Sequence, residues 1–255
     1  MSGGNRLIAE PVFLLSPPRS GSTLLRCILD THSCIRSPQE LHLKHLRVRL
    51  ETAHCRLSLE LLGYSETELG YLLWDRLLYE ELRSSGKQVL VEKSPCNVDI
   101  VDELQRCWPD ARFVVLLRHP LRVARSVLDN FTDHDLETAT RQLVRVDEVV
   151  QRLRSRPRGV LTVRYEALVA FPSRTLRQIC EYLGLIYEPE MLNYGRQDHG
   201  PYIYGLGDWG KRIRSGVVLR EHALGPLPCT PALITICRQW GYDDQPAAPG
   251  GILYS

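Results

Sequence analysis

A short stretch near the N-terminus, LLSPPRSGSTLL, joins an apolar run to an amphipathic helix through a turn rich in hydroxyl side chains. Backbone N–H groups and the helix dipole converge on an anion at such a helix N-terminus. Gly21 lets the backbone approach a ligand closely, Ser22 and Thr23 add hydroxyl donors, and Arg19 adds a permanent charge. An N-cap on a plain surface helix is the alternative. We therefore predict a phosphate-sized ligand at Pro18, Arg19, Ser20, Gly21, Ser22 and Thr23.

This loop differs from the nucleoside triphosphate loop GxxxxGK[ST], because the Gly-Lys pair is absent. The sequence also offers no convincing aspartate at a strand end for magnesium, which disfavours an ordinary kinase or GTPase. Two alternatives stay open at this point. One is a kinase-like phosphotransferase with an unusual loop, and the other is a non-catalytic nucleotide-binding protein of the same fold.

A second candidate anion site lies in FVVLLRHPLRVARSVL. A buried strand delivers Arg118 to its end, and Pro120 begins a helix that carries Ser126 two turns along. Either Arg118 and Ser126 clamp a second phosphate, or Arg118 caps the strand while Ser126 packs within the helix. Because ligands of open parallel sheets lie outside the carboxyl ends of the strands, both loops should face one crevice.

The elements that must position these loops alternate along the chain, since short apolar runs are interleaved with segments of helical period. This pattern predicts one α/β domain over residues 1–255, with a central parallel sheet of four to five strands flanked by helices and with tails at 1–10 and 243–255. Residues 184–230 are expected to be irregular. The predicted strands are 11–15, 88–91, 112–117 and 159–163, and the predicted helices are 22–31, 66–84, 98–107, 120–131, 136–154, 173–183 and one that begins near 231.

Composition limits the partners and the compartment. The 32 basic and 30 acidic residues give a net charge of +2, too balanced for a chain that mainly coats nucleic acid or a membrane. Eight cysteines form no CxxC pair and no zinc-like spacing, so we interpret them as scattered, mostly buried small hydrophobic residues, and a reducing cytoplasm is the simplest compartment. No signal peptide and no membrane-spanning apolar run of roughly 18 residues is apparent.

The two loops together resemble those of sulfotransferases. SPPRSGSTLL is similar to their 5′-phosphosulfate loop, and LLRHPLRVARSVL is similar to their 3′-phosphate motif, in which an arginine and a serine hold the 3′-phosphate. The resemblance implies a P-loop-like fold, 3′-phosphoadenylyl sulfate (PAPS) as donor and 3′,5′-ADP (PAP) as product. VRYEALVAFPSRTLRQICEYLGL resembles a downstream segment of the same enzymes, which places Tyr165 near the adenine.

Two branches of this family are closest in pattern. SPQELHL and VEKSPCN resemble tyrosylprotein sulfotransferases, in which a glutamate is the general base and a lysine touches the transferring sulfate; the matching residues are Glu40 and Lys93. SPQELHL with YGLGDWGKRIRSG resembles sulfotransferase domains of polyketide and olefin synthases. Those domains sulfate a β-hydroxyl on an acyl chain bound to a carrier protein, so the acceptor is expected to be such a chain or a small-molecule alcohol.

Metal-independent sulfuryl transfer to an alcohol needs a base near the hydroxyl and cations that balance charge on the leaving oxygen. Arg19 and Lys93 are the candidate cations, although a lysine after a strand can also be a plain surface residue. Glu40, His42 and His199 compete as the base, ranked with Glu40 first and His199 second. Trp209, Gly210 and Lys211 are expected in a flap that closes on the nucleotide. Arg141 and Arg145 share a helix face that is either solvated or part of the acceptor pocket.

Overall fold

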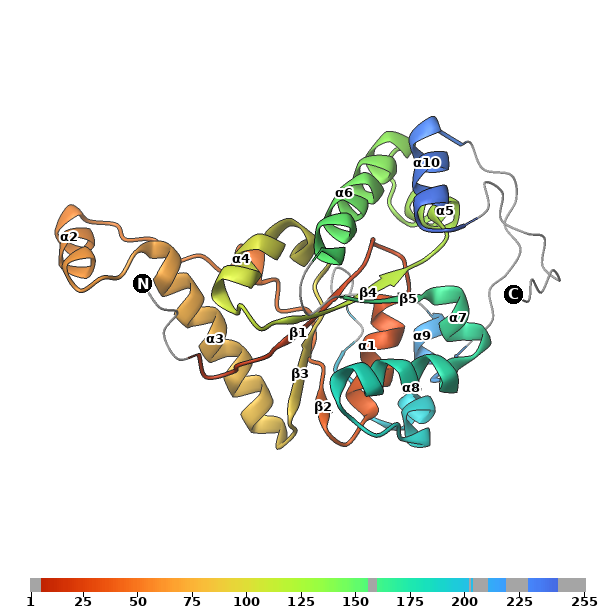
Figure 1. Ribbon diagram of the computed structural model, residues 1–255, viewed down its shortest axis with the longest axis horizontal. Coiled ribbons are helices and arrows are strands. Elements are labelled where there is room, and N and C mark those ends of the chain that lie inside the picture. Colours follow the sequence, from red (N-terminus) through yellow and green to blue (C-terminus); the bar gives the residue numbers. More distant parts are fainter. Residues whose placement is uncertain (1–5, 156–159, 202, 204–210, 219–228, 243–255) are drawn as a thin grey trace.

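Five parallel strands form the centre of the molecule in the computed structural model, which describes residues 6–155, 160–201, 203, 211–218 and 229–242. The strand order is β2-β3-β1-β4-β5, so β1 lies in the middle with β3 and β4 on its two sides (Figure 1). The predicted α/β class and the parallel sheet are confirmed. The strands are β1 (Val12–Leu15), β2 (Ile35–Arg36), β3 (Val89–Glu92), β4 (Arg112–Leu117) and β5 (Leu161–Arg164).

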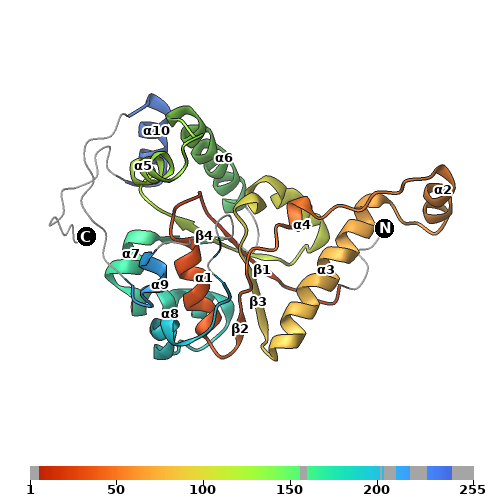
Figure 2. The ribbon, with the colours of Figure 1, turned by 180° about the vertical axis from the view of Figure 1, so that it is seen from behind.

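Helices cover both faces of this sheet (Figures 1 and 2). Each predicted helix forms, although the one expected at 98–107 begins as a 3₁₀ turn. The α-helices are α1 (Ser22–Thr31), α2 (Ala53–Leu61), α3 (Glu66–Ser85), α4 (Val101–Cys107), α5 (Pro120–Asn130), α6 (Leu136–Arg154), α7 (Tyr165–Ala170), α8 (Pro172–Leu183), α9 (Lys211–Arg214) and α10 (Pro231–Gln239). Three 3₁₀ segments accompany them: η1 (Leu43–His45), η2 (Pro95–Ile100) and η3 (Pro189–Arg196).

The central strands β1 and β4 are largely apolar because both of their faces are buried. Along β1, Phe13 and Leu15 pack with α3, α4, α5, α6 and α10, whereas Val12 and Leu14 pack with α1, α7, α8 and η3. Successive side chains of a strand point to opposite faces, so one four-residue strand contributes to two separate cores. Packing in these two cores holds the carboxyl ends of β1 and β4 in place, and the candidate loops begin at these strand ends.

Several elements were not predicted from the sequence, and the expectation that residues 184–230 are irregular is wrong in part, because η3 and α9 lie in this stretch. The edge strand β2 has only two residues, Ile35 and Arg36, which is too short for an apolar run to identify. The helix α7 begins at Tyr165, directly where β5 ends, without a turn residue between them. The helix α2 has no buried side chain, so it lacks the apolar stripe that marks a helix packed on a core.

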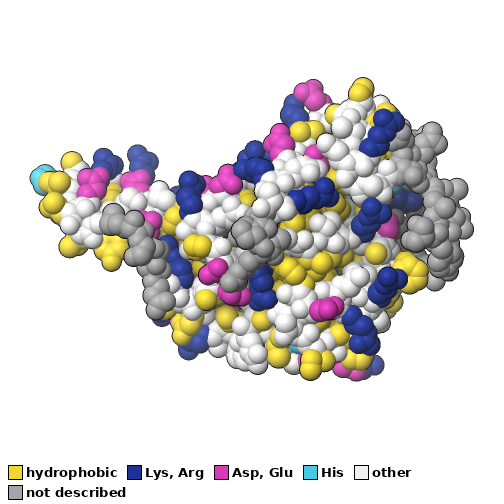
Figure 3. All heavy atoms as spheres, viewed as in Figure 1, with side chains coloured by type: hydrophobic (Ala, Val, Ile, Leu, Met, Phe, Trp, Pro, Cys, Tyr) yellow, Lys and Arg dark blue, Asp and Glu magenta, His cyan; other side chains and the backbone are white. Residues whose placement is uncertain are grey.

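The helix α2 and the adjoining end of α3 project from the body of the molecule as an arm (Figures 1 and 2). Hydrophobic side chains lie at its surface (Figure 3), among them Leu57, Leu61 and Leu62, which are 57%, 79% and 71% exposed. The arm leaves the body through η1, directly after the segment that carries Glu40 and His42.

Residues 6–10, predicted as part of a tail, are fastened to the body. The backbone N–H groups of Leu7 and Ile8 donate to the Asp75 carboxylate of α3 at 2.7 and 3.2 Å. The same carboxylate accepts from Nε1 of Trp108 at 3.1 Å. Asp75 therefore joins the entry to β1, the helix α3 and the end of α4. The remaining predicted tail residues, 1–5 and 243–255, lie outside the described residues.

Candidate active site

The loop between β1 and α1 leaves its hydrogen-bond donors open to a ligand. Gly21 caps α1 with φ 86° and Arg19 precedes it with φ 61°, so two left-handed residues turn the chain sharply. No side chain caps the N-terminus of α1, and the first amides of a helix have no partner within it. The buried Ser20 hydroxyl also has no hydrogen-bond partner among the described residues. Together with the positive end of the helix dipole, these groups fit an anion.

The second predicted anion motif lies against this loop. Arg118, at the end of β4, donates to the backbone oxygen of Arg19 at 2.8 Å, and Nε of Arg19 donates to Oγ of Ser126 at 3.3 Å. The guanidinium of Arg118 stacks over the Tyr165 ring, 4.8 Å from its centroid. The structure therefore places Arg19, Arg118, Ser126 and Tyr165 at one edge of the sheet. The two loops meet there as expected for the carboxyl ends of parallel strands, whereas Tyr165 was expected nearby only from the family resemblance. Pro18 lies half-buried in the same loop.

Tyr165 also explains why residue 21 is glycine. A Cβ atom at this position would lie 2.4 Å from Cδ2 and from Cε2 of the Tyr165 ring, well inside contact distance. The left-handed backbone of Gly21 is a second reason, because side chains disfavour that conformation. The backbone of the loop is thus held between the aromatic ring and the space left for a ligand.

A buried ion pair stands beside the first turn of α1. The ammonium of Lys93, directly after β3, donates to Oε1 of Glu40 and lies 3.4 Å from Oγ1 of Thr23. Nε2 of His42 is 3.3 Å from the other oxygen of Glu40, and the ring of His42 is partly exposed. Burial lowers the pKa of Lys93, and the Glu40 carboxylate opposes that shift. The two leading catalytic candidates are therefore in contact, next to the anion loop.

Arg26 holds the segment that carries Glu40, a role that the sequence analysis did not identify. This buried side chain on α1 donates to the backbone oxygens of Ser37 at 3.1 Å and of His199 at 3.3 Å. Ser37 in turn donates through its hydroxyl to the Val91 oxygen at 2.8 Å. The sequence feature that could have identified Arg26 is its position as a lone arginine in the apolar pattern of α1, because a buried charge needs partners.

His199 occupies a different position from Glu40. Its Nδ1 lies 3.1 Å from Oδ2 of Asp30, and its Nε2 lies 2.8 Å from the backbone oxygen of Tyr194. Burial tends to raise the pKa of Asp30, but hydrogen bonds from His199 and Ser37 and nearby cations hold it below its usual value. His199 contacts the last turn of α1 and Lys93 contacts the first, about 12 Å apart at 1.5 Å per residue. The structure does not bring His199 to the ion pair.

Most of the predicted flap lies outside the residues that the structure describes. Trp209 and Gly210 lie outside the described residues, and Lys211 begins α9 without a described side chain. The stretch that follows is anchored, since the Tyr194 hydroxyl donates to the backbone oxygens of Ile213 at 3.3 Å and of Val217 at 3.2 Å.

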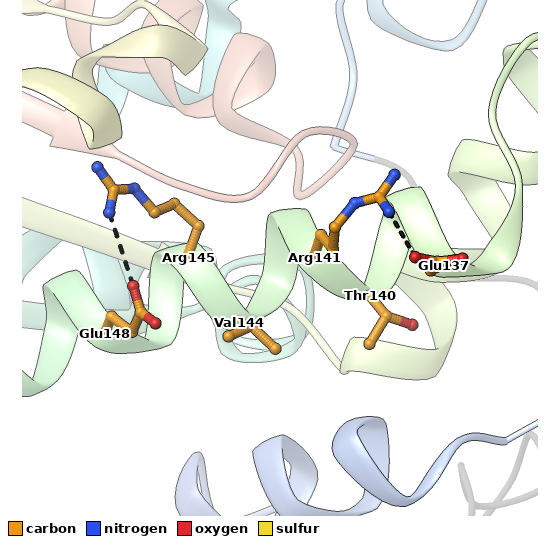
Figure 4. Close-up of a pocket in the computed structure, with 6 residues that line it drawn as sticks. All are labelled: Glu137, Thr140, Arg141, Val144, Arg145 and Glu148. Carbon is orange, nitrogen blue, oxygen red and sulfur yellow. Dashed lines mark hydrogen bonds and ion pairs between the residues drawn. The ribbon is translucent and has the colours of Figure 1, made fainter.

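Arg141 and Arg145 line a shallow cavity of about 260 Å³ on one side of α6 (Figure 4). Arg141 pairs with Glu137 at 2.5 Å, and Arg145 lies 3.6 Å from Glu148 and 3.5 Å from Asp99. Both arginines are about half exposed or more, so the face is a solvated, charge-balanced stripe.

Within the described part of the chain, no group of three or more His, Cys, Asp or Glu side chains is arranged to hold a metal ion. Over the same residues, none of the helices combines the length and apolar character that crossing a bilayer demands.

The chain has relatives of known class. Nodulation protein NoeE of Sinorhizobium fredii is 26% identical over 237 residues, which cover 78% of this chain and 55% of that protein. Protein-tyrosine sulfotransferase of Drosophila melanogaster is 23% identical over 198 residues, which cover 72% of this chain and 40% of that protein. The chain thus spans about half the length of the curated relatives that it matches.

Solved structures share the fold. The sulfotransferase domain from the olefin synthase of Synechococcus PCC 7002 superposes with a TM-score of 0.69 at 23% identity, over 92% of this chain and 97% of that one. The sulfotransferase domain from the curacin biosynthetic pathway gives 0.65 at 22% identity, over 92% and 99%. The sulfotransferase family model matches residues 11–189, well over half of the sequence. With this match and the shared fold, the chain belongs to the sulfotransferase family.

Proposed function

We propose that this protein transfers the sulfuryl group of PAPS to a hydroxyl acceptor, without a metal ion. The observation that carries the proposal is the contact of Lys93 with both Glu40 and Thr23, which joins a carboxylate base and a buried cation to the anion loop. The open amides and the orphaned Ser20 hydroxyl fit the 5′-phosphate side of the donor. Arg118 and Ser126 fit its 3′-phosphate, and Tyr165 offers a ring face for its base.

In the proposed reaction, Glu40 accepts the proton of the acceptor hydroxyl while that oxygen forms a bond to sulfur. The bond between sulfur and the bridging oxygen of the 5′-phosphate breaks, and 3′,5′-ADP leaves with the electron pair. Arg19 and the first amides of α1 balance the charge that develops on the leaving phosphate, and Lys93 balances charge on the sulfuryl oxygens. Lys93 contacts Glu40 directly, so the proposed base and the proposed cation act side by side.

We propose Glu40 rather than His199 as the base because Glu40 lies at the N-terminal end of α1, beside the anion loop. His199 lies at the opposite end of this helix. Both ring nitrogens of His199 face fixed partners, Asp30 and the Tyr194 carbonyl. His199 then serves to hold the loop after η3 against α1. His42 borders Glu40 at 3.3 Å and is partly exposed, which suits a group that passes the proton from Glu40 to water.

The acceptor class is part of the proposal, and the relatives support it. Two solved neighbours come from the curacin pathway and an olefin synthase, and curated relatives include protein-tyrosine sulfotransferases. We propose a β-hydroxyacyl chain on a carrier protein, or another small-molecule alcohol, as the acceptor. A panel containing a carrier-bound β-hydroxyacyl chain, a tyrosine peptide and simple alcohols separates these classes.

The first test is donor binding. At a hundredfold excess over its dissociation constant, 3′,5′-ADP should stabilise the fold by about 2.7 kcal/mol, and ATP with magnesium should do less. Thermal unfolding in the presence of each nucleotide measures this difference. Absence of a shift with 3′,5′-ADP would refute a PAPS enzyme, and a larger shift with magnesium ATP would favour a kinase-like protein.

The second test is transfer of labelled sulfate to the panel. Glu40→Gln should lower kcat by about 10²- to 10⁴-fold while 3′,5′-ADP still binds, since an amide cannot accept the proton. Glu181→Gln, on the exposed face of α8, is the matched control and should change kcat less than twofold. Normal nucleotide binding without transfer to any acceptor would indicate a non-catalytic protein instead.

A further inference from the structure

Glu92 is a buried carboxylate that no step of the proposed reaction uses. It is the last residue of β3 and has no exposed surface. Taking a carboxylate out of water costs several kcal/mol, which an apolar residue of the same strand would avoid. Burial raises the pKa of Glu92, and hydrogen bonds from Ser94 and Asn97 oppose that shift. A residue kept at this cost needs a role other than packing.

The hydrogen bonds of Glu92 reach the residues that adjoin both catalytic candidates. Its Oε1 accepts from the backbone N–H of Leu41 at 3.2 Å and from the Ser94 hydroxyl at 2.6 Å. Leu41 follows Glu40 in the chain, and Ser94 follows Lys93. Its other oxygen accepts from the side-chain amide of Asn97 in η2. One carboxylate thus joins the segment of the base to the strand end of the cation.

Ser94 extends this link by one further residue. Its hydroxyl donates to Glu92 and accepts from the backbone N–H of His42 at 2.9 Å. His42 has φ 50°, a left-handed conformation that costs a side-chain-bearing residue about 1–2 kcal/mol. The bond from its N–H holds that strained turn, which directs the chain away from the site into η1 immediately after Glu40.

Building on the proposed sulfuryl transfer, we propose that Glu92 is a positioning residue. It fixes the backbone of Leu41 and His42 to the end of β3, so that Glu40 and Lys93 keep the separation that the reaction needs. Its own carboxylate accepts hydrogen bonds from Leu41, Ser94 and Asn97. The role requires hydrogen bonds of the right geometry rather than a negative charge.

This requirement makes the glutamine variant informative. In Glu92→Gln, the side-chain oxygen can still accept from Leu41 and Ser94, whereas the new amide brings two N–H donors. Oδ1 of Asn97 is buried without a hydrogen-bond partner among the described residues, so a flip of the Asn97 amide gives one of these donors an acceptor. Glu92→Ala removes every one of these bonds. Ser94→Ala is a milder change that removes the bond to His42 and one bond to Glu92.

Steady-state transfer kinetics give the first readout. We expect Glu92→Gln to keep kcat within about threefold of wild type, and Glu92→Ala to lower kcat about 10²-fold with an unchanged KM for PAPS, because a misplacement of about 1 Å costs that much. Ser94→Ala should lower kcat about tenfold. A folded Glu92→Ala variant with wild-type kcat would overturn the proposal, and so would a glutamine variant as inactive as the alanine variant.

Amide hydrogen exchange gives a readout that does not depend on transfer. The amides of Leu41 and His42 should be protected in wild type and in Glu92→Gln, and Ser94→Ala should speed exchange at His42 at least tenfold. Unprotected amides in wild type would overturn the proposal even if the enzyme is active. If wild type transfers no sulfate, the proposed function fails, but exchange still decides whether Glu92 holds this segment. Exchange in Ser94→Ala also decides the matter if Glu92→Ala does not fold.

Discussion

Replacing Gly21 with alanine should be far more damaging than a glycine-to-alanine change usually is. The φ of 86° costs a side-chain-bearing residue about 1–2 kcal/mol. The added Cβ would also lie 2.4 Å from two carbons of the Tyr165 ring, and relieving such overpacking costs about 1–3 kcal/mol. We therefore expect the free energy of unfolding to fall by about 2–5 kcal/mol.

Gly63 provides a matched control. Its φ is 82°, close to that of Gly21, but a Cβ there meets no atom within 4 Å. Gly63→Ala should thus cost only the backbone part, about 1–2 kcal/mol. Urea unfolding of both variants measures the difference, provided that the m-values stay equal. Because the displaced ring stacks on Arg118, Gly21→Ala should also weaken the binding of 3′,5′-ADP, whereas Gly63→Ala should not.

A double-mutant cycle separates the two contributions. In a Tyr165→Leu background the clash is reduced, so Gly21→Ala should then cost about as much as Gly63→Ala. If Gly21→Ala costs no more than Gly63→Ala in the wild-type background, the contact with Tyr165 does not explain the glycine. An equal cost in both backgrounds would contradict the explanation in the same way.

Three further predictions follow from single side chains. Arg118→Lys should weaken 3′,5′-ADP binding about tenfold in calorimetry. An ammonium cannot both stack on Tyr165 and donate to the Arg19 carbonyl as the planar guanidinium does. Unchanged affinity would exclude Arg118 as a ligand of the 3′-phosphate. Asp75→Ala should lower the unfolding free energy by about 2–4 kcal/mol in urea, since it leaves the buried Trp108 indole N–H unpaired; a loss under 0.5 kcal/mol would contradict it. The pKa of Asp30 is below 3.8 in the fold, so its ionised form stabilises the protein above about pH 4 and that contribution is lost as pH falls through the lowered pKa. Asp30→Asn should therefore cost about 1–3 kcal/mol at pH 7 and less near pH 3, and a cost independent of pH would refute the linkage.

The anion loop is predictable from sequence because its parts are local. An apolar strand, a Ser-Gly-Ser-Thr turn and a helix start stand next to one another between Val12 and Thr31. The same holds for Arg118 and Ser126, which one strand and one helix carry. Their meeting also follows from sequence, since parallel neighbouring strands deliver both loops to the same edge of the sheet.

The three candidate bases could not be distinguished in this way. Glu40, His42 and His199 all lie in irregular segments, where periodicity gives no direction to a side chain. Only the packed chain places Glu40 against Lys93 and turns His199 toward Asp30. The hydrogen bonds that hold the segment of Glu40 in place come from Arg26 and Glu92. Both are charged residues within otherwise apolar elements, and their partners cannot be read from the sequence.

The sequence by itself determined the α/β class, the parallel sheet, the positions of the two candidate anion-binding loops and the family, because each depends on short-range patterns of strand, turn and helix. The tertiary structure decided which carboxylate meets the cation, why residue 21 is glycine, and how residues 37–42 are fastened to β3. Such contacts join segments tens of residues apart, and only the burial of both faces of the sheet brings those segments within hydrogen-bond distance.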